Sequence, residues 1–127
     1  MFDPPTAGEW WLRRPELVGA LSDTAARLVL VNAPAGSGKT VLVAQWCASL
    51  AGSRRCGWVC LDARDNDPAR LWWHVVSALQ QSYPELRAGD VLRWLWAVTP
   101  DAAGTLLPVL VNELAALSVP VVLVLDN

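Results

Sequence analysis

The chain has 127 residues and a mass of 13.8 kDa, which is the size of one small domain. Apolar residues make up 54% of it and charged residues 17%, a composition that excludes a disordered chain and predicts a buried core. Lys and Arg number 10 and Asp and Glu number 12, so the net charge is −2 and no basic excess is present to hold DNA.

The sequence shows no sign of a membrane span or of export. No apolar run approaches the roughly 18 residues of a membrane-spanning helix. The first residues, MFDPPTAGEWW, lack the basic start and the apolar stretch of a signal peptide. We therefore expect a cytoplasmic chain without membrane association. The cysteines lack CxxC spacing and His74 is the only histidine, which favours reduced thiols over a tetrahedral metal site; the cysteines are Cys47, Cys56 and Cys60.

The first part of the chain predicts a tail, two helices and one strand. Residues 1–12 are expected to form a loose tail, followed by a short helix over 14–21 with Pro15 in its first turn. The apolar, partly β-branched run 27–31 predicts a strand buried on both faces, as in a parallel sheet. Apolar residues at helical spacing predict a helix over 40–50.

The second part of the chain predicts two strands that flank three helices. Asp67 can cap the first of these helices, and Pro68 suits its first position. The alternation of strands and helices along the whole chain predicts an α/β layer fold with parallel strands. The elements are expected, in chain order, over 57–61, 67–83, 91–98, 105–117 and 121–125.

The stretch between the first strand and the following helix has the pattern of a phosphate-binding loop. Gly36 and Gly38 allow a tight turn, so that successive backbone N–H groups and the helix N-terminus can face phosphate oxygens. Lys39 would reach the β- and γ-phosphates of a nucleotide, and Thr40 would offer its hydroxyl to Mg²⁺. The pattern usually begins with glycine, where this chain has alanine. The predicted nucleotide-binding residues are Ala33, Pro34, Ala35, Gly36, Ser37, Gly38, Lys39 and Thr40.

The alternative interpretation of this stretch is a glycine-rich turn with an incidental lysine. The flanking strand and helix count against it, because a phosphate-binding loop requires that context. Lys39 is also the only lysine in the chain. A sequence that otherwise uses arginine keeps lysine where a flexible ammonium is needed. We therefore predict Lys39 as a catalytic residue that contacts the phosphates.

A second acidic group is expected at the end of the last strand. P-loop enzymes hold Mg²⁺ with an aspartate that follows an apolar strand, and Asp126 follows the run 121–125. Together with the upstream loop, this position predicts Asp126 as a catalytic residue and as a magnesium ligand beside Thr40. The alternative is an ordinary strand-ending aspartate. The next residue, Asn127, cannot take up a proton as a base, although it can orient a water.

At this point the chain resembles a family over about residues 13–127. The three stretches that carry the resemblance are RLVLVNAPAGSGKT followed by VLVAQW, WVCLDARDNDPARLWWHVVSALQ, and LVNELAALSVPVVLVLDN. They are similar to the nucleotide-binding domain of MalT-like, large LuxR-type transcriptional regulators, which are STAND-class ATPases related to AAA+ proteins. Many families share the phosphate-binding loop, and the DNDPAR stretch makes the resemblance specific. The chain departs from the family at Leu71, where an aromatic residue is usual, and at Asn127, where a second aspartate is usual.

The resemblance implies a fold, a ligand and a role. The fold is the three-layer α/β/α arrangement of P-loop NTPases with a parallel sheet, here truncated after the Walker B strand, so that 13–127 is a partial nucleotide-binding domain. The ligands are ATP or ADP with Mg²⁺, and the tract 11–17 lies near the adenine unless it is only a packing helix. The role is a nucleotide-dependent switch with slow ATP hydrolysis in the complete protein. DNA binding then belongs to a C-terminal helix-turn-helix absent from this chain, and self-association would depend on ATP.

The acidic cluster before the second predicted helix has two interpretations. Helix capping and turn formation are favoured over a regulatory or sensing role. Arg70 is interpreted as a residue of the helix surface. The cluster consists of Asp62, Asp65, Asn66 and Asp67.

Two other functions stay open beside the regulator. A small-molecule P-loop kinase would need an acceptor-binding acid after the second strand, where Asp62 and Asp65 lie, and an Arg-rich lid, which the chain lacks. A gene fragment without function is the third alternative. Helical repeats and a helix-turn-helix downstream of Asn127 would decide for the regulator.

Overall fold

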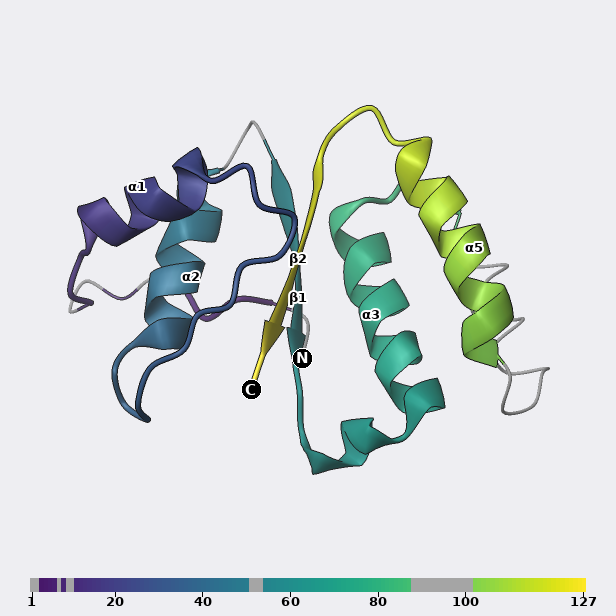
Figure 1. The fold of residues 1–127 in the computed structure, drawn as a ribbon, viewed down its shortest axis with the longest axis horizontal. Coiled ribbons are helices and arrows are strands. Elements are labelled where there is room, and N and C mark those ends of the chain that lie inside the picture. Colours follow the sequence, from purple (N-terminus) through teal and green to yellow (C-terminus); the bar gives the residue numbers. More distant parts are fainter. Residues whose placement is uncertain (1–2, 7, 9–10, 51–53, 88–101) are drawn as a thin grey trace. The chain divides into compact units, whose positions relative to one another are not determined.

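A computed structural model describes residues 3–6, 8, 11–50, 54–87 and 102–127 of the chain (Figure 1). These residues form two compact units. One lies within Pro4–Ser53, and the other comprises Arg54–Asn127 together with Asp3.

The Pro4–Ser53 unit is built on two helices, α1 (Pro15–Asp23) and α2 (Lys39–Ser49). Proline suits the first turn of α1, because a backbone N–H in that turn has no hydrogen-bond acceptor within the helix, so its absence in proline costs nothing. Two side-chain hydrogen bonds tie α1 and the segment before it to α2. Gln45 donates from Nε2 to the Leu12 carbonyl at 3.0 Å, and Trp46 donates from Nε1 to the Ser22 hydroxyl at 3.2 Å.

The strand predicted over 27–31 is wrong for this structure. The backbone forms no strand there, and the side chains of Leu28 and Leu30 are 86% and 85% exposed. A strand is stabilised by hydrogen bonds to a neighbouring strand, and the described residues of this unit contain no strand that could pair with the run. The apolar run therefore indicated a tendency to be buried, but it did not indicate whether a neighbouring strand would be present to pair with it.

The Arg54–Asn127 unit contains a parallel sheet of two strands, β1 (Arg55–Cys60) and β2 (Val121–Asp126). In the register, Arg55 lies opposite Val121 and Cys60 lies opposite Asp126. The prediction of an α/β fold with parallel strands is confirmed for these two strands. Their bounds differ from the predicted ones by one or two residues.

The described residues of this unit also form the helical segments η1 (Ala63–Asn66), α3 (Pro68–Ser82) and α5 (Ala102–Ala115). Figure 1 shows α3 beside the strands and α5 on the far side of α3. Helix α5 begins three residues before the predicted start and contains Pro108. The helix predicted over 91–98 lies outside the described residues. Among the helices that the structure describes, none is both long and apolar enough to cross a membrane.

The core of this unit forms where α3 packs on β1. The two elements lie in contact at Gly57, where a Cβ would be 3.4 Å from Leu79 Cδ2 and 3.5 Å from the Ala78 backbone, which are ordinary van der Waals distances. Apolar residues of α3 and of the segments after it fill the space. The buried cluster consists of Val75, Val76, Leu79, Tyr83, Leu86 and Leu110.

Candidate functional site

The predicted phosphate-binding loop adopts a conformation that requires its glycines. Gly36 and Gly38 have φ of +77° and +85°, a region that side-chain-bearing residues rarely occupy. The Ser37 N–H donates to the Pro34 carbonyl at 3.2 Å and closes the turn. Gly38 immediately precedes α2, and its carbonyl accepts the first bond of the helix from the Leu42 N–H at 2.9 Å. The loop therefore delivers the chain directly onto a helix N-terminus, as the glycine pattern predicted.

Lys39 is the first residue of α2, and its side chain folds back over the loop. Its ammonium donates to the Ala33 carbonyl and, at 3.2 Å, to the Pro34 carbonyl. Both acceptors are neutral. A phosphate oxygen carries charge and forms stronger hydrogen bonds with an ammonium than a carbonyl does. An anionic ligand can therefore compete for Lys39.

The hydroxyl of Ser37 also lies in the loop. Its Oγ is buried and makes no hydrogen bond to any residue that the structure describes. Buried polar atoms in folded proteins are nearly always paired, so an orphaned hydroxyl in this loop is consistent with a polar ligand that completes it.

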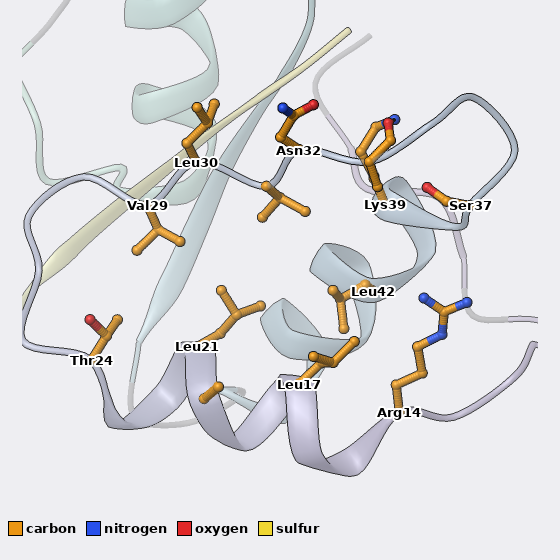
Figure 2. Close-up of a pocket in the computed structure, with 13 residues that line it drawn as sticks. Arg14, Leu17, Leu21, Thr24, Val29, Leu30, Asn32, Ser37, Lys39 and Leu42 are labelled. Atoms are coloured by element: carbon orange, nitrogen blue, oxygen red, sulfur yellow. Dashed lines mark hydrogen bonds between the residues drawn. The ribbon is translucent and has the colours of Figure 1, made fainter.

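A pocket of about 450 Å³ opens beside the loop, a volume typical of small-molecule sites. Its lining comes from α1, the segment before the loop, the loop itself and α2. Figure 2 shows Leu21 and Val29 in its apolar part, whereas Arg14, Ser37 and Lys39 gather toward its other end. The pocket thus offers apolar walls and a cationic end to one ligand.

Asp126 lies in the other unit, as the last residue of β2. Its carbonyl accepts from the Leu61 N–H at 2.7 Å, so it sits at the carboxyl edge of the two parallel strands. That edge is where open α/β sheets bind their ligands. Lys39 and Thr40 belong to the Pro4–Ser53 unit, and a magnesium site made by Thr40 and Asp126 stays a prediction.

The acidic cluster after β1 forms caps and a turn, which confirms the favoured interpretation. Asp62 accepts from the Arg64 N–H at 2.7 Å, and Asp65 accepts from the Asp62 N–H at 2.8 Å, a reciprocal capping box on η1. Asp67 caps α3 by accepting from the Ala69 N–H at 3.2 Å.

Sequence reasoning missed the ion pair with Arg70 and the contact with His74 that surround Asp65. The carboxylate is 4% exposed and lies 3.0 Å from Arg70 Nε and 2.9 Å from His74 Nδ1. The Asp62 N–H, followed by the Arg70 guanidinium, holds the pKa of Asp65 below its usual value. Arg70 is thus not merely a residue of the helix surface. Its spacing of four residues from His74, which places both on one face of α3, could have indicated a shared partner.

The described residues offer no other ligand set for a metal. No group of three His, Cys, Asp or Glu side chains in that part of the chain could hold an ion. The three cysteines, which all lie in the described part of the chain, form no disulfide bond.

Comparison with known proteins finds similarity to the HTH-type transcriptional regulator MalT of several bacteria. The chain is 50% identical over 68 residues to that of Serratia proteamaculans and 46% identical over 68 residues to that of Yersinia enterocolitica, in each case 53% of this chain and 7% of the relative. It is 39% identical over 79 residues to that of Cronobacter sakazakii, 61% of this chain and 8% of the relative. No family model and no solved structure matches the chain. The resemblance to MalT-like regulators is confirmed, and the matched stretch spans less than a tenth of these relatives.

Proposed function

We propose that this chain is the nucleotide-binding part of a MalT-type transcriptional regulator, with ATP or ADP as its ligand. The observation that carries the proposal is the loop itself. Two glycines at positive φ precede a helix N-terminus, and a lysine and an orphaned hydroxyl accompany them. These groups fit a phosphate chain. The similarity to regulators supports the role in transcription.

Each part of the ligand would contact a different set of residues. The loop backbone and Lys39 would hold the phosphates, and Thr40 and Asp126 would hold Mg²⁺. The apolar part of the pocket, which includes Leu17 and Val29, would take the base. Bound ATP supplies a γ-phosphate whose presence or loss distinguishes two states of the protein.

The complete protein would use this site as a slow switch. Asn127 follows Asp126 and has no group that can take up a proton, so activation of water would be poor. A long-lived ATP state suits a switch and would control self-association. DNA contact would come from a helix-turn-helix elsewhere in the protein.

The kinase alternative loses support in the structure. It needs a free carboxylate after β1 to bind an acceptor. Asp62 is instead engaged by Arg64, and Asp65 by Arg70 and His74. The two acids stabilise the turn between β1 and α3.

Replacing Lys39 by alanine tests the proposed function. The substitution removes a charge-assisted contact worth about 1.5–3 kcal/mol, so affinity for a fluorescent ATP analogue should fall roughly tenfold or more. Arg27→Ala is the matched control, because Arg27 is an exposed cation of the same unit that does not line the pocket. It should leave the affinity unchanged. Equal affinities of Lys39→Ala and the parent chain would contradict the proposal.

Asp126 is tested through the magnesium dependence of the same binding. If Asp126 holds the ion, Mg²⁺ should tighten ATP binding to the parent chain, and Asp126→Asn should lose most of this gain. The measurement is the ratio of ATP affinities with Mg²⁺ and with a chelator. A ratio that is the same for both chains would remove Asp126 from the site and leave the loop assignment standing.

A further inference from the structure

Arg14 places a second cation at the phosphate-binding loop. The residue precedes α1 and lines the pocket together with Ser37 and Lys39. A Cβ at Gly38 would lie 3.9 Å from Arg14 Nη2, so the guanidinium approaches the residue that starts α2. Figure 2 shows the guanidinium directed toward Ser37.

Among the residues that the structure describes, the guanidinium of Arg14 makes neither an ion pair nor a hydrogen bond, whereas Arg55, Arg64 and Arg70 each pair with a carboxylate. A cation at a helix N-terminus is unfavourable, because that end of the helix already carries partial positive charge. Lys39 adds a second positive charge to the same site. An anion is the group that would relieve this repulsion.

The fold fixes Arg14 in this position. The Leu12 carbonyl, two residues before it, accepts from Gln45 of α2, and Ser22 near the other end of α1 accepts from Trp46 of α2. These two bonds hold α1 along α2, and the start of α1 is thereby held beside the loop. These contacts therefore hold the backbone of Arg14 beside the phosphate-binding loop.

We propose that Arg14 is a second phosphate-binding residue, which joins α1 to the loop through the phosphate chain of the ligand. The inference rests on the proposed function and deepens it. Two cations and a helix N-terminus favour a ligand with several negative charges, so the site selects nucleoside di- and triphosphates over monophosphates.

The test compares two probes, ATP and inorganic tripolyphosphate, by calorimetric titration of the parent chain and of four variants: Arg14→Gln, Arg14→Lys, Arg13→Gln and Lys39→Ala. Arg14→Gln should bind both probes roughly tenfold more weakly than the parent chain, because the lost contact is to the phosphates. Its affinity should also depend less steeply on salt, since one fewer positive charge meets the ligand. Arg14→Lys keeps the charge and should recover part of the affinity. Arg13→Gln is the matched control, an exposed neighbour that does not line the pocket, and should behave as the parent chain.

The outcomes separate this inference from the proposed function. If Arg14→Gln binds as the parent chain while Lys39→Ala binds weakly, Arg14 is not a phosphate ligand and the nucleotide site stands. A loss confined to ATP would assign Arg14 to the base or ribose and overturn the inference. An equal loss in Arg13→Gln would show a general effect of charge and overturn it as well. If the parent chain binds neither probe, both proposals fail.

Discussion

Leu79→Ala should destabilise the Arg54–Asn127 unit by about 2–5 kcal/mol, the usual cost of removing a buried leucine side chain. Leu79 is 2% exposed and belongs to the buried cluster, and its Cδ2 lies 3.4 Å from the position of a Cβ at Gly57. The smaller side chain leaves a cavity between α3 and β1 that the backbone cannot close without moving the helix. Urea unfolding followed by circular dichroism measures the loss.

The matched control for this prediction is Leu107→Ala in α5. Leu107 is 39% exposed, and alanine is an equally good helix former, so the free energy of unfolding should change by about 0.5 kcal/mol or less. Similar losses for the two variants would show that the contact between α3 and β1 is not the core of the unit.

Tyr83→Phe should cost about 1–3 kcal/mol, because it removes the hydroxyl that pairs with two partly buried backbone groups. The Tyr83 side chain is fully buried. Its hydroxyl donates to the Arg55 carbonyl and accepts from the Val122 N–H at 3.2 Å, so it joins the starts of both strands to the end of α3. Gln81→Ala, at an exposed position of the same helix turn, should change stability by less than about 0.5 kcal/mol. A loss in Tyr83→Phe no larger than in this control would contradict the prediction.

The same hydroxyl predicts how stability depends on alkaline pH. Burial raises the pKa of Tyr83 above its ordinary value of 10.0. The folded chain therefore holds this proton more tightly than the unfolded chain does. The resulting stabilisation is complete below pH 10 and is lost as the pH rises through the folded-state pKa. Tyr83→Phe lacks the proton, so its deficit relative to the parent chain should shrink above pH 10. Tyr83 is the only tyrosine, and tyrosinate absorbance reports its ionisation directly.

The Tyr83 hydroxyl also bears on the predicted magnesium ligand, because β2 ends at Asp126. Tyr83 holds the start of the strand, and the pairing of Cys60 with Asp126 together with the bond from the Leu61 N–H holds its end. The register thereby fixes which residue of the strand reaches the carboxyl edge of the sheet. A slip of one residue would turn Asp126 to the opposite face.

The sequence by itself determined the local features of this protein. Gly36 and Gly38 predicted the turn because few other residues tolerate its positive φ, and Pro68 predicted a helix start because its ring fits the first turn. The caps made by Asp62 and Asp67 also lie within two residues of the groups they bind. Each of these interactions forms between residues a few positions apart, so the local sequence is enough to predict it.

Only the tertiary structure decided the features that depend on residues far apart in the chain. The run 27–31 had the composition of a buried strand, yet no strand among the described residues of its own unit pairs with it. Arg14 reached Gly38 because α1 lies along α2, and neither spacing nor composition encodes that approach. The physical reason is that strand pairing and the meeting of distant side chains are properties of packing. A pattern of apolar residues states that a segment tends to be buried, and the packed chain decides which neighbour buries it.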